Sequence, residues 1–230
     1  IFTVSDISNE KRRRVLERIF FHDILNTTSS LQFTAYMLKS ADFPDKEDLI
    51  EKITLISEAL NDEIAAQRTL TNAESDELDV QISIFQSSDV LSEIAKLYSN
   101  FELTKNHQII INPTSTDVML NTDRVLVKRV IGNMIKNALE ACRPGDPVNL
   151  GCEAQGQFTR FWVHNPGFIP RDIQLQIFQR SFSTKGFGRG LGTYSIKLLT
   201  ERYLKGNAAF TTSPEAGTRF TITLPNNLEA

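Results

Sequence analysis

Residues 133–141 read NMIKNALEA, and the fold of the second half of the chain is built around this stretch. The surrounding residues predict a long helix over 122–142, because apolar side chains recur at helical spacing, at Ile131, Met134, Ile135 and Leu139. Asn133 and Asn137 lie four residues apart and so share one face of that helix. Two amides on one face can hold a hydrated Mg²⁺ ion and phosphate oxygens, since Mg²⁺ prefers oxygen ligands and keeps several waters. Taken alone, such a pair is more often simply a polar helix surface.

A glycine-rich segment lies further along the chain. Residues 180–199 read RSFSTKGFGRGLGTYSIKLL, with glycine at every second position from 186 to 192, and a helix is predicted from about 193 to 204. Free backbone N–H groups and the helix dipole favour an anion such as a triphosphate at a helix start, and Lys185 and Arg189 add positive charge. The spacing does not match a dinucleotide fingerprint, and no strand precedes it. We predict a phosphate-covering lid, with a plain flexible loop as the alternative.

A third motif places an asparagine at the end of a strand. Residues 163–170 read VHNPGFIP, and Asn165 follows the strand predicted over 158–164. Its side-chain oxygen can accept a hydrogen bond from the amino group of adenine. Asn-Pro-Gly is also ordinary turn chemistry, and a turn is the preferred interpretation of these residues alone.

The second half as a whole is predicted to be an α/β sandwich. Besides the helices already named, a helix is expected over 88–99. Strands are expected over 80–85, 107–112, 117–120, 147–154 and 158–164, with a closing hairpin over 208–225. Consecutive antiparallel strands at the end, without regular βαβ units, predict a mixed sheet with helices on one face.

The first half is predicted to be an antiparallel helical hairpin, which makes the whole chain an α+β multidomain protein. One helical pattern begins at Ser8 or Asn9 and runs to about Lys39, and a second runs to about Leu70 after the break SADFPDK at 40–46. A single hairpin cannot cover its own apolar stripes. Pairing two copies into a dimeric four-helix bundle would cover them.

A histidine lies on the polar side of the first helix. Residues 20–26 read FFHDILN, and on a helical wheel His22, Asp23 and Asn26 share the arc opposite the apolar side chains. A surface histidine beside ordinary polar residues is the simpler explanation for this segment alone. The chain's two other histidines, His107 and His164, are expected to have structural roles.

Composition narrows the class of protein. The 230 residues are 40% hydrophobic with a net charge of −3, which is ordinary for a globular protein and gives no general reason to bind nucleic acid or an anionic membrane. Two cysteines without CxxC spacing indicate neither a zinc site nor a disulfide framework and favour a cytoplasmic location. Since the first residue is Ile and no apolar run of about 18 residues occurs, we expect a fragment whose sensor or membrane anchor lies upstream.

In this order, the motifs resemble the transmitter core of bacterial sensor histidine kinases over nearly all of residues 9–225. The resemblance implies a dimerisation and phosphoacceptor domain over 9–74 and a catalytic ATP-binding domain of the gyrase type over 75–230. Residues 1–8 look like the end of a PAS-like sensor and its linker. Expected partners are a second copy of the chain, ATP with Mg²⁺, and the receiver domain of a response regulator.

The resemblance also implies roles for individual residues. His22 is expected to accept the phosphoryl group, Asp23 to support that transfer, and Asn26 to orient a water that dephosphorylates the regulator. Asn137 is the expected Mg²⁺ ligand, and Asn165 occupies the adenine-reading position. The remaining expected nucleotide-binding residues are Asn133, Lys136, Gly167, Phe178, Phe182, Thr184, Lys185, Gly188, Arg189, Gly190, Leu191, Gly192 and Thr218.

One departure from the family pattern stands out. The family usually has an aspartate followed by two glycines where this chain has Asn165, Pro166, Gly167 and Phe168. An amide lacks the charge assistance of a carboxylate, so weaker ATP binding is expected. The leading hypothesis is a histidine kinase that autophosphorylates on His22 and passes the group to an aspartate of a regulator, which it also dephosphorylates. The alternatives are a nucleotide-responsive scaffold or phosphatase-only dimer, and a gyrase-type or chaperone-type ATPase.

Overall fold

The structure is a computed structural model of the chain, and it describes residues 24, 28–29, 31–38, 46–99, 107–179 and 191–228. The chain divides into two compact units, with the main division between Leu78 and Asp79. Each unit is described by itself below.

The first unit is helical in its described residues up to Glu74, and residues 75–78 form a turn and an irregular segment. Residues 31–38 are helical, and α2 spans Lys46–Glu74, one turn beyond the predicted end near Leu70. Several large apolar side chains of these helices are exposed in the single chain, at Phe33, Tyr36, Ile50 and Ile64. The predicted break at 40–46 lies outside the described residues except for Lys46, at which α2 begins. The hairpin and its four-helix bundle stay predictions.

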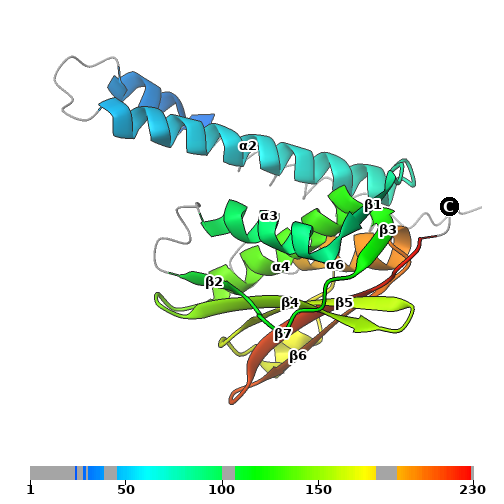
Figure 1. Ribbon diagram of the computed structural model, residues 1–230. Coiled ribbons are helices and arrows are strands. Elements are labelled where there is room, and N and C mark those ends of the chain that lie inside the picture. Colours follow the sequence, from blue (N-terminus) through cyan, green and yellow to red (C-terminus); the bar gives the residue numbers. More distant parts are fainter. Residues whose placement is uncertain are drawn as a thin grey trace, which may run out of the picture. The chain divides into compact units, whose positions relative to one another are not determined.

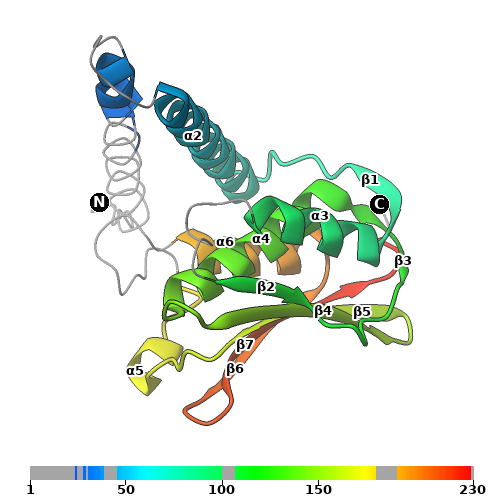
Figure 2. The ribbon, with the colours of Figure 1, turned by 60° about the vertical axis from the view of Figure 1, so that its left-hand side comes forward.

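The second unit contains a five-stranded sheet with helices on one face (Figures 1 and 2). Its strands are β2 (Gln108–Ile111), β4 (Pro147–Gln155), β5 (Phe158–Asn165), β6 (Asn207–Ser213) and β7 (Gly217–Pro225). The spatial order is β2-β4-β5-β7-β6, with β2 parallel to β4 and every other neighbouring pair antiparallel. The predicted mixed sheet is confirmed.

Two further strands form a separate ribbon, which the sequence did not predict. β1 (Ile82–Gln86) pairs antiparallel with β3 (Met119–Asp123) and not with the main sheet. Both strands were expected from their alternating pattern, but such a pattern does not specify which strand is the partner. An isolated bridge between Asn121 and Asn227 ties this ribbon to the end of the described chain.

The helices covering the sheet are α3 (Ser87–Ser99), α4 (Arg124–Ala141) and α6 (Leu191–Leu198), and a short α5 (Arg171–Gln174) lies beyond β5. Inward-facing Phe161 and Val163 of β5 pack under the helices, because successive side chains of a strand alternate between faces. The apolar residues of α4 that predicted this helix are all buried, at Ile131, Met134, Ile135 and Leu139.

A buried carboxylate fixes the start of α4, and α6 continues into a π-helical turn. Asp123 caps α4 by accepting a hydrogen bond from the Leu126 backbone N–H at 2.9 Å. Its second carboxylate oxygen accepts from the Gln81 N–H at 2.8 Å, which holds the start of β1. α6 begins two residues earlier than predicted and continues as a π-helical turn over Leu199–Tyr203, in which the Leu204 N–H bonds to the Leu199 carbonyl.

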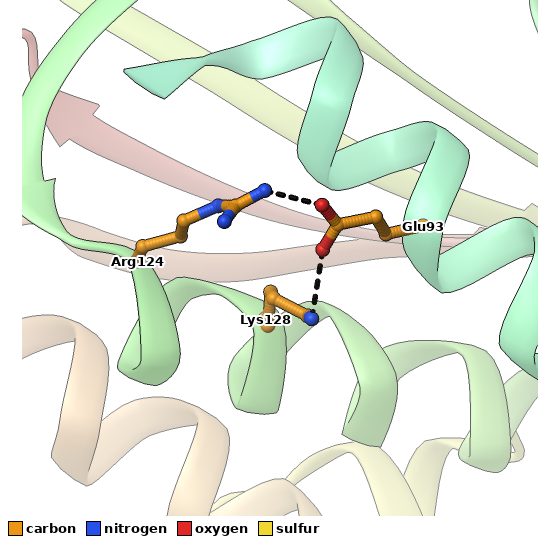
Figure 3. Close-up of polar contacts among 3 residues, drawn as sticks. All are labelled: Glu93, Arg124 and Lys128. Atoms are coloured by element: carbon orange, nitrogen blue, oxygen red, sulfur yellow. Dashed lines mark hydrogen bonds and ion pairs between the residues drawn. The ribbon is translucent and has the colours of Figure 1, made fainter. Parts of the chain in front are cut away.

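An ionic link joins α3 to α4 (Figure 3). Glu93 of α3 accepts hydrogen bonds from Arg124 and Lys128 of α4, the latter at 2.8 Å between Nζ and Oε2. The hydrogen bond from Lys128, with the positive charges of Lys128 and Arg124, lowers the pKa of Glu93. The three side chains are partly solvated, so this link is a modest contribution to stability.

Candidate nucleotide-binding site

The two predicted asparagines of α4 lie against the first turns of α6. Asn133 Nδ2 donates to Ser195 Oγ of α6 at 3.5 Å. A Cβ atom placed on Gly192, the second residue of α6, would lie 3.2 Å from Asn137 Oδ1. The structure therefore brings Asn133, Asn137 and Gly192 together at the helix that follows the glycine-rich segment.

Asn137 carries a polar group that the described residues leave unsatisfied. Its Nδ2 atom is buried and makes no hydrogen bond within the part of the chain that the structure describes. Leaving such a donor without a partner costs about 1–3 kcal/mol. A phosphate oxygen at the start of α6 would supply the missing acceptor, and it would also meet the free N–H groups of that helix. These residues fit a phosphate group.

A second cluster lies at the end of β5. Asn165 is 2% exposed, and the strand register places it opposite Thr218 of β7. Thr218 Oγ1 donates to the Gly167 carbonyl at 2.6 Å, so the predicted Asn165, Gly167 and Thr218 meet at one point. Asn165 Nδ2 is also buried without a hydrogen-bond partner among the described residues.

Phe178 fixes the chain just before the glycine-rich segment. Its ring makes edge-to-face contacts with Phe210 of β6 and Phe220 of β7, at centroid distances of 5.7 and 6.2 Å. Lys197 of α6 places its ammonium group 5.6 Å from the Phe178 centroid. These contacts tie residues before the segment to the helix after it, and they are apolar and cation–π packing contacts.

Two residues of these clusters were missed by the sequence analysis. Ser195 of α6 accepts the hydrogen bond from Asn133. Its place in the first turns of the helix that follows the glycine-rich segment could have indicated that it lies near the predicted phosphate site. Thr212 of β6 bonds to Thr218 Oγ1 at 2.8 Å. That pairing depends on the register between β6 and β7, which the sequence does not specify.

Several predicted residues lie outside the described part of the chain. They are His22, Asp23, Asn26, Phe182, Thr184, Lys185, Gly188, Arg189 and Gly190. Leu191 begins α6, and Lys136 is exposed on α4 between the two asparagines. The other histidines contact backbone carbonyls, with His164 Nε2 at 2.7 Å from Ala216 O and His107 Nδ1 at 3.3 Å from Asp146 O, which supports their structural interpretation.

The described residues carry no cluster of metal-binding side chains and no disulfide. Among them, no group of three or more His, Cys, Asp or Glu side chains could hold a metal ion. Cys142 and Cys152 are both free thiols. None of the helices in the described ranges has the length and apolar character needed to cross a bilayer.

A known protein family matches the part of the chain that contains these clusters. Residues 122–228 fit the family described as histidine kinase-, DNA gyrase B-, and HSP90-like ATPase. Sensor histidine kinase CusS of Escherichia coli O157:H7 is 24% identical over 229 residues, covering 96% of this chain and 44% of that protein. The chain thus spans less than half the length of this curated relative.

Solved structures share the fold. Full-length ShkA in complex with AMPPNP aligns with a TM-score of 0.64 at 16% identity, covering 94% of this chain and 46% of that one. Histidine kinase ThkA in complex with the response regulator TrrA aligns with a TM-score of 0.59 at 21% identity, covering 99% and 69% of the two chains. These findings do not favour the scaffold or phosphatase-only alternative, and they match residues 122–228 to the family of histidine kinase-, DNA gyrase B-, and HSP90-like ATPases.

Proposed function

We propose that the chain is the kinase core of a two-component sensor, which autophosphorylates on His22 with ATP and passes the phosphoryl group to an aspartate of a response regulator. The observation that carries this proposal is the pair of buried, unpartnered amide nitrogens of Asn137 and Asn165. They lie at two different places of the matched ATPase domain, one at the start of α6 and one at the end of β5. A nucleotide has a phosphate end and a base end, and each would satisfy one of these amides.

The phosphate end is assigned to α4 and the segment leading into α6. Asn133 and Asn137 face the start of α6, where backbone N–H groups favour negative charge. Mg²⁺ bound through the Asn137 oxygen would neutralise phosphate charge during transfer. Further contacts are assigned to Lys136, Phe182, Thr184, Lys185, Gly188, Arg189, Gly190, Leu191 and Gly192.

The base end is assigned to the Asn165 cluster. Asn165 is the base-reading residue, because its amide can both donate and accept hydrogen bonds. Gly167 and Thr218 hold the backbone and the neighbouring strand in place beside it. Phe178 supports the region by packing onto β6 and β7.

His22 is assigned as the phosphoacceptor. A neutral imidazole nitrogen of His22 attacks the γ-phosphorus, so that an N–P bond forms and the bond from the γ-phosphorus to the bridging oxygen breaks, with ADP leaving. Asp23 accepts a hydrogen bond from the other ring N–H and stabilises the positive charge on the ring. Asn26, one helical turn further on, is assigned to orient a water for dephosphorylation of the regulator.

The helical unit is assigned to dimerisation. Phe33, Tyr36, Ile50 and Ile64 are exposed in the single chain, and a second copy would cover such side chains in a four-helix bundle. The proposed partner is the receiver domain of a regulator, in keeping with the solved complex of ThkA and TrrA. We assign the chain to the cytoplasm, where ATP is available, as part of a longer sensor.

The test is incubation with γ-labelled ATP and Mg²⁺ followed by acid and base treatment. We expect label that acid releases and base leaves intact, and its loss in His22→Gln. The chain has three histidines, so His107→Gln and His164→Gln are matched controls that should keep the label. Label that survives His22→Gln would reject the assignment, and nucleotide binding without any label would favour a scaffold. Steady release of inorganic phosphate would favour a gyrase-type ATPase.

A further inference from the structure

The amide of Asn165 is enclosed but not hydrogen-bonded at its nitrogen. The residue is 2% exposed, and no described residue accepts a hydrogen bond from Nδ2. Buried polar groups in native proteins are nearly always paired with protein, water or a ligand. A buried donor without a protein partner, in a domain that binds a nucleotide, points to a ligand atom as its acceptor.

The neighbouring hydroxyls are already engaged with one another. The Ile169 N–H donates to Thr212 Oγ1 at 3.1 Å, and Thr218 Oγ1 donates its proton to the Gly167 carbonyl at 2.6 Å. The 2.8 Å bond between the two threonine hydroxyls must then run from Thr212 to Thr218, because the single proton of Thr218 is already used. This chain of bonds therefore closes without using the Asn165 amide nitrogen.

The surroundings of Asn165 are otherwise close-packed. A Cβ on Gly167 would lie 2.8 Å from Asn165 Nδ2 and 2.9 Å from the Ala141 carbonyl oxygen. Gly217, at a φ of +71°, approaches so closely that its Cβ would lie 2.3 Å from the Asn165 carbonyl oxygen. These contacts fix the shape of the site. A half-turn about the Asn165 Cβ–Cγ bond exchanges the amide nitrogen and oxygen with almost no change in that shape.

On the basis of the nucleotide site proposed above, we propose that Asn165 lets this domain bind 6-oxo purine nucleotides about as well as adenine nucleotides. Adenine presents an amino donor at position 6 and an acceptor at N1, whereas hypoxanthine presents an acceptor at position 6 and a donor at N1. An amide offers one donor and one acceptor side by side, so either orientation matches one of these bases. A carboxylate only accepts, so at this position it would favour the 6-amino group and repel the 6-oxo group.

The test compares ADP with IDP, which differ only at position 6 and the adjoining N1. Binding of each to the full chain with Mg²⁺ is measured by isothermal titration calorimetry, which requires neither His22 nor phosphoryl transfer. We expect the two dissociation constants to agree within about threefold, because both bases find two complementary hydrogen bonds. Asn165→Asp should shift their ratio by about tenfold in favour of ADP, since a charge-assisted bond to the 6-amino group replaces a neutral one.

Asn207→Asp is the matched control. Asn207 is exposed at the start of β6, and it pairs with Thr223 while Asn165 pairs with Thr218 of the same strand β7. The control adds the same charge to the same sheet away from the amide and should leave the ratio unchanged.

Two outcomes would overturn the proposed base preference, and a third would contradict the proposed function. A wild-type preference for ADP of tenfold or more would overturn the inference while leaving the kinase proposal intact. An unchanged ratio in Asn165→Asp, with the fold verified by circular dichroism, would show that this residue does not read the base and would also overturn the inference. Failure of the wild-type chain to bind either nucleotide would contradict the proposed function itself.

Discussion

Gly192 and Asn137 are in tight apposition: a Cβ on Gly192 would lie only 3.2 Å from Asn137 Oδ1. This contact joins the second residue of α6 to the asparagine face of α4. A glycine at this position of α6 leaves room for the amide, because any side chain there would press on the Asn137 amide, which we assign to phosphate and Mg²⁺.

Gly192→Ala should weaken nucleotide binding while leaving the fold intact. Ala favours helix over Gly by up to about 1 kcal/mol, so the free energy of unfolding should stay the same or rise. The affinity for ADP with Mg²⁺ should fall about fivefold or more, because Asn137 must move to admit the methyl group. Calorimetric titration and urea denaturation of the same samples check both signs. Unchanged affinity together with a lower stability would contradict the assignment.

Asp123→Ala should be strongly destabilising. Asp123 is buried, and its two carboxylate oxygens accept hydrogen bonds from the Leu126 and Gln81 N–H groups. Loss of an N-cap and of a buried bond should lower the free energy of unfolding by about 2–4 kcal/mol in urea denaturation. Asp172→Ala, at an exposed residue of α5, is the control and should change it by less than about 0.5 kcal/mol. Equal effects of the two variants would refute the capping role.

Glu93→Gln should have a small effect that depends on pH. Since Lys128 and Arg124 lower the pKa of Glu93 in the folded protein, the stabilisation is present above its unfolded pKa, about 4.3, and is lost as the pH falls through the lowered value. The partly solvated link should be worth less than about 1 kcal/mol at pH 7 and less again in high salt. Urea denaturation at pH 7 and below pH 4 tests this. A difference between the variant and the wild type that grows at low pH would contradict it.

Cys142 should react slowly with thiol reagents at neutral pH. Burial, with the charge of Asp146 nearby, raises the pKa of this thiol to about 11, and only the thiolate is nucleophilic. The rate of alkylation by iodoacetamide should therefore keep rising up to about pH 11 in the folded chain. The unfolded chain should titrate near 8.5, so folding stability should decline between these two pH values. Cys142→Ser identifies this thiol's share of the reaction, and a folded-state midpoint near 8.5 would contradict the assignment.

Most of the second unit could be predicted from periodicity. The helix around Asn133 and Asn137 was predicted within two residues at each end because its apolar side chains recur at helical spacing and are buried. β5 and β7 could be predicted because apolar and polar residues alternate along both strands, and buried positions recur along them in the structure. The asparagines and glycines of the candidate site were found because their types and spacing are distinctive.

Other features depend on contacts that a single sequence does not reveal. The alternating pattern of β1 does not reveal that this strand pairs with β3 and not with a strand of the main sheet. The π-helical turn at Leu199–Tyr203 breaks the regular period of α6, and the short α5 is too brief to show a period. The role of Thr212 follows from the register between β6 and β7, and the unsatisfied state of Asn137 and Asn165 emerges only when burial is known.

In the proposed kinase, one nucleotide held between the start of α6 and the end of β5 delivers its terminal phosphoryl group to His22. The most direct test is peptide mass spectrometry of the chain after incubation with ATP and Mg²⁺, with digestion kept at neutral to basic pH. We expect the mass of one added phosphoryl group on the peptide that contains His22, and its absence in Asn137→Ala with the fold preserved. A phosphoryl group located on any other residue, or none on the wild-type chain with ATP bound, would contradict it.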